Sequence, residues 1–180
     1  QDFLNFSDNS GETRLDIFIQ VQFSEIQFIR TSDGYVGNYS VSVSVYQMDK
    51  ETLVTEKIWN EKINIATFEE SSAKSNYNLS YRSINMKPGK YFIKTTVTDN
   101  ESRSEYSSSN EFEVRDLSER PSISDIMLVT KKNSVGGSDK IFPNISRNVS
   151  ESEDKIKLYF EVYSDSLTMY NIEYVVETKY

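Results

Sequence analysis

Apolar and polar side chains alternate at every second position along much of this chain. The clearest case is residues 39–45, in which one tyrosine and three valines alternate with three serines. Successive side chains of a β-strand point to opposite faces of a sheet, whereas a helix would spread the same valines around its surface. The pattern therefore predicts strands with one buried and one solvated face, and it restricts the chain to sheet architectures.

A second strand, at residues 91–98, is bounded by turn signals. Pro88 presets φ for the first central position of a turn, and Gly89 accepts the positive φ that a type II turn needs at the second. The strand itself is rich in aromatic and β-branched residues, which favour a pleated surface. Residues 99–102 supply the closing turn. This order is typical of an inner strand of an antiparallel sandwich, with Tyr91 as a tyrosine corner whose hydroxyl bonds nearby backbone.

Shorter alternating stretches predict the remaining strands. In the first part of the chain they are residues 15–21, 25–30, 53–65, 77–81 and 106–114. In the second part they are residues 123–129, 141–145, 157–163 and 170–176, the last two forming a hairpin. Residues 133–138 are expected to be a flexible loop, and residues 148–154 a polar loop.

Two local features interrupt the strand pattern. Trp59 falls on one face of the predicted strand at residues 53–65, whereas Ile58 and Val54 fall on the other face. A bulge or bend is therefore expected between the two sets. Thr67 and Glu70 have the spacing of a capping box, in which the threonine caps the backbone and the glutamate reaches back. The residues that follow lack an apolar stripe, so one short helical turn is expected there.

These elements predict an all-β chain: an immunoglobulin-like antiparallel β-sandwich followed by a second, smaller β-sandwich module. Residues 1–13 are expected to be a flexible lead-in, residues 14–116 the sandwich, residues 117–122 a linker, and residues 123–180 the second module. The three or four strands of the second module fall short of the seven of a full sandwich. We therefore expect that module to be incomplete and the native polypeptide to continue.

Composition excludes several classes of function. The chain has neither histidine nor cysteine, so Ser-His-Asp and Cys-His catalysis, disulfides and zinc sites of the usual kinds are closed to it. Its formal charge is −8, and it has no cluster of basic residues for a phosphate backbone, so nucleic acid is not an expected partner. It has no apolar run long enough for a transmembrane segment. No catalytic or cofactor-binding residue is predicted.

Two acidic turns offer the hard oxygen ligands that Ca²⁺ prefers. One contains Asp99, Asn100 and Glu101 at a strand end, and the other contains Asp8, Asn9, Ser10 and Glu12. Neither has the spacing of an EF-hand loop, and acidic turns are ordinarily solvated. Both therefore stay candidates beside the simpler interpretation of a solvated turn.

Aromatic side chains offer a second kind of candidate site. Trp59, Tyr35, Tyr39 and Tyr106 could form a flat platform that binds a glycan. The chain has 12 tyrosines, however, and most tyrosines of a sandwich are half-buried in the core or at an interface. A protein is therefore the first expected partner, and a glycan is the alternative.

Several segments resemble the N-terminal region of the bacterial GWxTD-domain proteins. The likeness is carried, in order, by residues 14–21 (RLDIFIQV), 28–30 (FIR), 88–91 (PGKY), 97–99 (VTD), 124–126 (SDI) and 158–163 (LYFEVY). The resemblance implies an exported bacterial protein with tandem β-sandwich modules and no established enzymatic activity. The motif that names the family is not in these residues, because the sole tryptophan, Trp59, stands in Ile-Trp-Asn. No functional residue is carried over by that motif.

Three functions follow from this reading. The first is a non-catalytic, exported β-sandwich scaffold or interaction module of a larger envelope protein, located in the periplasm, at the cell surface or outside the cell. Its partner would be another protein or later domains of the same polypeptide, and edge strands would be the working surface. The second is a carbohydrate-binding accessory module. The third is the inert N-terminal part of an enzyme whose active site lies beyond Tyr180.

Overall fold

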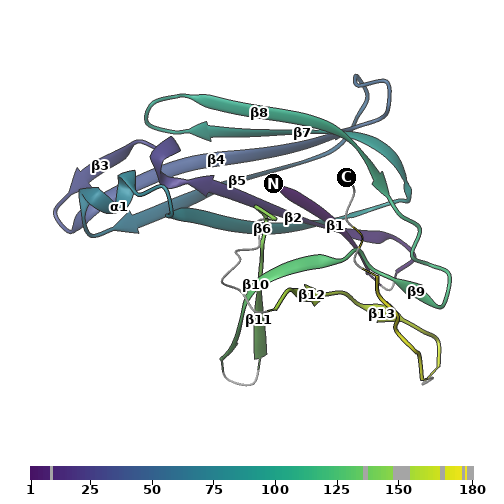
Figure 1. Cartoon of the computed structure of the whole chain (residues 1–180). Helices are drawn as coiled ribbons and strands as arrows, with labels where there is room; N and C mark the ends of the chain where they lie inside the picture. The colour runs from purple at the N-terminus through teal and green to yellow at the C-terminus, as the bar shows by residue number, and fades with distance from the viewer. Residues whose placement is uncertain (9, 136–137, 148–154, 167–168, 176, 178–180) are drawn as a thin grey trace.

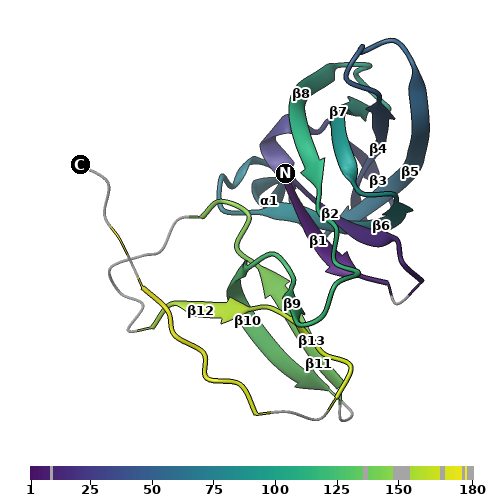
Figure 2. The same cartoon turned by 90° about the vertical axis from the view of Figure 1, so that its right-hand side faces the viewer.

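The computed structural model describes the chain except for residues 9, 136–137, 148–154, 167–168, 176 and 178–180. Its described part is nearly all β, as predicted, and its main body is an antiparallel sandwich of two sheets. A smaller group of strands, β9 to β13, lies against one face of that sandwich (Figures 1 and 2). No helix among the described residues is long and apolar enough to cross a membrane.

The first sheet of the sandwich has the order β1-β2-β6. It consists of β1 (Asp2–Ser7), β2 (Thr13–Gln22) and β6 (Tyr77–Met86), all antiparallel to their neighbours. β2 pairs with β6 along its whole length, from Thr13 opposite Met86 to Gln22 opposite Tyr77. β1 pairs with only the first part of β2, up to Phe18.

The second sheet is built on the long strand β4 (Gly34–Tyr46). β5 (Leu53–Ile65) pairs with one edge of β4, while β3 (Phe28–Thr31) and β7 (Gly89–Asp99) pair with successive parts of the other edge. β8 (Glu105–Val114) pairs with β7 and ends the sheet. The sequence predicted a single strand at residues 25–30, but the 3-10 turn η1 (Phe23–Glu25) precedes β3 there.

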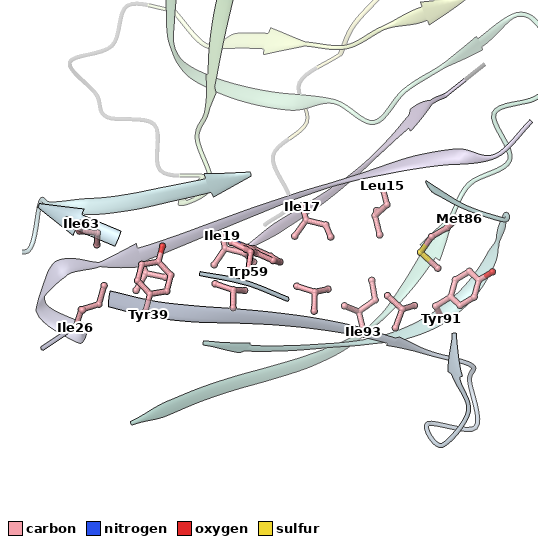
Figure 3. Packing of buried hydrophobic residues seen from close by; sticks show 14 of the residues in the cluster. Leu15, Ile17, Ile19, Ile26, Tyr39, Trp59, Ile63, Met86, Tyr91 and Ile93 are labelled. Carbon is pink, nitrogen blue, oxygen red and sulfur yellow. The ribbon is translucent and has the colours of Figure 1, made fainter. Parts of the chain in front are cut away.

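The core lies between the two sheets and follows the alternation in the sequence. Tyr39 and the three valines of β4 are fully buried, and Leu15 and Ile17 of β2 face them from the other sheet (Figure 3). The intervening serines of β4 point to the outer face of their sheet, since their neighbours on β7 are threonines and Lys94. Burial of these aliphatic side chains, at roughly 1.5–3 kcal/mol each, is the main stabilisation of the sandwich.

The predicted tyrosine corner is present where the chain crosses between the sheets. The Tyr91 hydroxyl donates to the Lys87 carbonyl oxygen at 3.0 Å, and the ring is 8% exposed. Gly89 has the expected positive φ, but its value of 156° differs from the roughly +80° of a type II turn. The type II prediction is therefore wrong: β7 begins at Gly89 itself, because the chain changes sheets here instead of forming a hairpin.

The first residues of the chain are not the flexible lead-in that the sequence suggested. Asp2–Ser7 form β1, in which Leu4 is 4% and Phe6 is 1% exposed. On the opposite face, Phe3 packs against Phe112 with ring centroids 5.7 Å apart. The strand escaped prediction because it is buried on both faces and so lacks the alternation of a half-buried strand.

The other local predictions have mixed outcomes. The Glu70 carboxylate accepts from the Thr67 backbone N–H at 3.1 Å, which confirms the capping box ahead of α1 (Phe68–Ser72). The bulge in β5 lies at Val54, where the register with β4 shifts. Pairing runs without interruption through Ile58 and Trp59, so Ile58 simply faces outward, 63% exposed.

The second module contains two small sheets. β9 (Ser122–Ile123) pairs with β13 (Val162–Tyr163), and β10 (Met127–Val135) lies between β11 (Ser138–Pro143) and β12 (Lys157–Tyr159). Two predictions here are corrected. Residues 133–135 and 138 belong to the β10–β11 hairpin instead of a flexible loop, and the described residues of the predicted strand at 170–176, residues 170–175, form no strand although they alternate.

The predicted division into domains stays a prediction, with two details changed by the structure. β1 belongs to the sandwich, and Leu117, in the predicted linker, is 2% exposed. The predicted polar loop at residues 148–154 lies outside the described residues.

Candidate functional site

The predicted aromatic platform does not exist as a set. Trp59 is 7% exposed and donates its indole N–H to the Ser80 hydroxyl at 3.2 Å. Tyr39 is fully buried and accepts from the Asn78 amide at 2.9 Å; burial raises the pKa of the Tyr39 hydroxyl to about 12, although that hydrogen bond lowers it. Both side chains therefore belong to the core, where their polar atoms are paired.

The other two aromatic candidates lie apart from a platform. Tyr35 is half-buried, and its ring centroid is 5.9 Å from that of Phe68. Tyr106 on β8 is 50% exposed. One exposed ring and one packed ring do not make the flat surface on which a sugar stacks. These four residues therefore do not form the predicted glycan-binding platform.

The acidic turn at the end of β7 has a structural role. Asp99 is 3% exposed, and its carboxylate accepts from the backbone N–H groups of Gln27 at 2.6 Å, Glu101 at 2.8 Å and Ser102 at 3.3 Å. Burial alone would raise the pKa of Asp99, but these hydrogen bonds outweigh it, and the pKa is lowered. Asn100 donates its own N–H to the Asn38 carbonyl. The turn thus ties β7 to the chain ahead of β3.

The other acidic turn is partly outside the described residues, since Asn9 is not among them. The Asp8 carboxylate accepts from the Ser10 backbone N–H at 2.8 Å and from the Asn85 amide at 2.7 Å. Within the described ranges, no three acidic side chains gather closely enough to hold a metal ion.

A partly buried polar network centred on Asn5 joins β1 to the second module, and we call this contact the seam. Asn5 is 2% exposed, and both its backbone N–H and its side-chain amide donate to Asp125 Oδ2 at 2.8 Å. The Arg115 guanidinium donates to Asp125 Oδ1 at 2.8 Å, and the Arg115 backbone N–H donates to Asn5 Oδ1 at 3.3 Å. The Asp125 N–H completes the exchange with the Asn5 carbonyl at 3.0 Å. Three separate segments of chain are thereby held in one geometry.

The seam continues along β1 to Glu161. The Ser124 N–H donates to the Glu161 carbonyl at 2.9 Å, and the Glu161 N–H donates to the Ser124 hydroxyl at 2.8 Å. The Tyr163 hydroxyl donates to Glu161 Oε2 at 2.6 Å and accepts from the Ser7 backbone N–H at 2.9 Å. Burial and this carboxylate raise the pKa of Tyr163, so its hydroxyl keeps its proton at neutral pH.

Apolar side chains close the rest of the seam. Leu4, Phe6 and Phe18 of the sandwich pack with Met127 and Val129 of β10 in a second core, separate from the one between the sheets. The Arg14 guanidinium lies 5.0 Å from the centre of the Phe6 ring, a cation–π contact. The two parts of the chain are therefore joined by both buried apolar area and paired polar groups.

A cavity of about 360 Å³ opens beside this second core, between the first sheet of the sandwich and β10 to β12. We call it the seam cavity. Asp16 lies in its wall, 5% exposed, and accepts from Arg14 Nε at 3.0 Å and from the Tyr81 hydroxyl at 3.1 Å. Burial raises the pKa of Asp16, while the Arg14 charge opposes this. Glu161 also lines the cavity, with its Oε1 atom 3.8 Å from Arg14 Nη2.

Sequence reasoning missed this site, although a weak signal existed. Arg14, Asp16, Asp125 and Glu161 all lie within segments that carry the resemblance to the GWxTD-domain proteins. Each is an acidic or basic residue inside a strand-like stretch, where a solvated side chain is the simplest expectation. The placement of β1 and β2 against the second module brings Asp125 to Asn5 and Glu161 to Arg14.

Comparisons with known proteins give only distant structural likenesses. The sequence matches no protein-family model and no curated protein. Among solved structures it is similar to a calcium-binding mutant of Bacteroides uniformis β-glucuronidase 2, with 12% identity over 62% of this chain and a TM-score of 0.43. It is also similar to a Bacteroides uniformis β-glucuronidase, with 13% identity over 63% of this chain and the same TM-score. The chain spans 13% of each of those proteins, and likeness at this level says nothing of activity.

Proposed function

We propose that this chain is a non-catalytic β-sandwich scaffold of a larger exported bacterial protein, related to the GWxTD-domain proteins. The observation that carries the proposal is the seam, in which buried Asn5 is bonded to Asp125 and Arg115. A buried polar group that loses its partner costs about 1–3 kcal/mol, so the network penalises any rotation of the two parts. The role that fits such a joint is a rigid spacer between other parts of a polypeptide.

The resemblance supports the same proposal. Its segments at residues 14–21, 124–126 and 158–163 contain several of the residues that line the seam and its cavity, among them Arg14, Asp125 and Glu161. A family likeness that includes the joint is expected if the relative position of the two modules is what the family uses. The exported location and the family itself remain part of this proposal.

Contact with a protein partner has a second candidate surface on β5. Among the described strands this one pairs with β4 alone, and it presents Leu53, Val54 and Ile58 at 52%, 41% and 63% exposure. An edge strand with apolar side chains can accept a strand from another chain. The Lys57 ammonium group donates to the Ser83 carbonyl of β6 at 2.8 Å, so this side chain covers part of the β5 edge that faces β6. Because Ile58 is exposed, Ile58→Lys should weaken the binding of a protein partner to β5 without unfolding the sandwich.

The remaining alternatives have less support. A carbohydrate-binding module would need exposed aromatic faces, and Trp59 and Tyr39 are buried. An enzyme with its reactive residues beyond Tyr180 would use the same rigid joint to hold its active site, and a longer chain with activity would identify it.

The test is a distance measurement across the seam. The chain has no cysteine, so spin labels can be placed at Ser109→Cys on β8 and Leu158→Cys on β12, both exposed. Electron–electron resonance should give one narrow distance distribution, as narrow as that of a control pair within the sandwich at Ser109→Cys and Glu51→Cys. A distribution several times broader than the control would show a flexible joint and would overturn the scaffold proposal.

A further inference from the structure

The seam cavity has an unequal balance of charge. Its polar wall contains one guanidinium, that of Arg14, and two carboxylates, those of Asp16 and Glu161. Tyr81 and Tyr159 also line it, and both are neutral phenols at neutral pH; burial, with Glu161, raises the pKa of Tyr159 to about 12. The wall therefore has one net negative charge.

Arg14 is already committed to the two carboxylates. Its Nε atom is 3.0 Å from Asp16 Oδ1, its Nη2 atom is 3.8 Å from Glu161 Oε1, and its Cζ atom lies 5.0 Å from the centre of the Phe6 ring. An anionic ligand would compete with these pairs and would meet two like charges. A cationic ligand would complete the balance of charge instead.

Each carboxylate keeps acceptor capacity for such a ligand. Asp16 Oδ2 has one long contact, 3.4 Å from Arg14 Nη2, while Glu161 Oε1 accepts from the Tyr159 hydroxyl at 2.8 Å. A carboxylate oxygen has two lone pairs, so further donors can be accommodated. An ammonium group has three donors and no acceptor, which suits a wall made mainly of acceptors.

The remaining wall is apolar and comes from both parts of the chain. Phe18 and Leu79 belong to the sandwich, and Met127 and Ile141 belong to β10 and β11. Phe18 is stacked on Tyr81, with centroids 5.1 Å apart and planes 29° apart. A volume of about 360 Å³ is within the range of small-molecule sites, which are mostly apolar with a few placed polar groups.

We propose that the seam cavity binds a small organic cation, a primary ammonium group carried on an apolar body. The ammonium group donates to the remaining acceptor positions of Asp16 and Glu161 on the cavity side of Arg14, and the apolar body packs on Phe18, Leu79 and Met127. Because the walls come from both modules, the ligand also strengthens the joint between them. The proposal does not depend on the scaffold role, since a flexible joint could close on the same ligand.

Three probes of one shape test the charge requirement: 2-phenylethylammonium, neutral 2-phenylethanol, and phenylacetate. In amide-resolved NMR titrations of the whole chain, the ammonium should shift the signals of residues that line the cavity. Its Kd should be at least tenfold lower than that of the alcohol, and phenylacetate should bind more weakly still. Equal affinity for the ammonium and the alcohol, tighter binding of phenylacetate, or shifts outside the cavity would each overturn the proposal.

Variants separate charge from shape. Glu161→Gln retains an acceptor for Tyr159 while removing the charge, and it should raise the Kd of the ammonium about tenfold while leaving the Kd of the alcohol within twofold. Leu79→Trp fills the cavity and should abolish binding of both. Glu51→Gln, in the exposed turn between β4 and β5, is the matched control and should change neither. If Glu161→Gln leaves the Kd of the ammonium unchanged in a chain whose spectrum is otherwise retained, the proposed site is wrong.

Discussion

Asp99 shows how one side chain can set the acid stability of a sandwich. Its carboxylate accepts from three backbone N–H groups and is 3% exposed, and its pKa is lowered below the ordinary value of 3.8. A carboxyl group with a lowered pKa in the folded state stabilises that state at all pH values above the unfolded pKa. This contribution disappears as the pH falls through the folded pKa.

Asp99→Asn should therefore lower the free energy of unfolding by about 1–3 kcal/mol at pH 7, the usual value of charged hydrogen bonds. The difference between variant and parent should shrink on acidification, beginning below about pH 4. Urea unfolding at a series of pH values measures it. A difference that stays constant down to pH 2 would show that the charge of Asp99 is not responsible.

Tyr91 provides a second test at the scale of one residue. Its hydroxyl bonds the Lys87 carbonyl while its ring packs in the core, so Tyr91→Phe removes the hydrogen bond and keeps the packing. The free energy of unfolding should fall by about 1 kcal/mol. Tyr35→Phe is the control, because the Tyr35 hydroxyl has no hydrogen-bond partner among the described residues, and it should change stability by less than half as much.

Residue roles that depend on nearby sequence were predictable, and those that depend on distant segments were not. The tyrosine corner needs only Tyr91 and a carbonyl four residues earlier, so the local sequence indicated it. The exposure of Trp59 depends on which strands lie opposite, and Ser80 and Arg82 of β6 cover it. The sequence contains no local sign of that contact.

At the scale of a single element, β5 offers a direct test of inward and outward positions. Ile63 is 7% exposed and belongs to the core, whereas Ile58 is 63% exposed on the same strand. Ile63→Ala should cost about 2–4 kcal/mol of unfolding free energy, and Ile58→Ala should cost less than about 0.5 kcal/mol. Thermal and urea unfolding of the two variants compare them. Equal losses would mean that the outer face of β5 is covered.

The strands of the sandwich were largely predictable because one face of each meets water. β4 and β7 alternate for that reason, and their register follows the alternation. β1 has no such pattern, since Phe3 faces Phe112 while Leu4 and Phe6 face the second module. Residues 169–175 show the opposite failure: they alternate, yet Tyr174 is 82% exposed and pairs with no strand among the described residues.

At the scale of the whole molecule, Asp125 links the stability of the two parts. Asp125→Ala removes the acceptor of the buried Asn5 backbone N–H and leaves the Asn5 amide only the Glu113 carbonyl, at 3.2 Å. We expect the free energy of unfolding to fall by about 2–3 kcal/mol. We also expect one unfolding transition to separate into two, because the second module no longer unfolds together with the sandwich. Calorimetry measures both effects. Glu51→Ala should show neither, and a single unshifted transition for Asp125→Ala would contradict the coupling.

Because β1 precedes its partners on β10 by more than 100 residues of chain, the seam has a consequence for biosynthesis. At about 5–20 residues per second, Leu4 and Phe6 wait roughly 6 to 25 seconds after translation for Met127 and Val129 to emerge from the ribosome. During that interval the nascent sandwich can fold while the apolar side of β1, which later packs against β10, stays exposed to solvent. A holding chaperone would bind this exposed apolar surface. Slower translation of residues 120–130 should therefore lengthen the time for which the chaperone stays bound to the nascent chain.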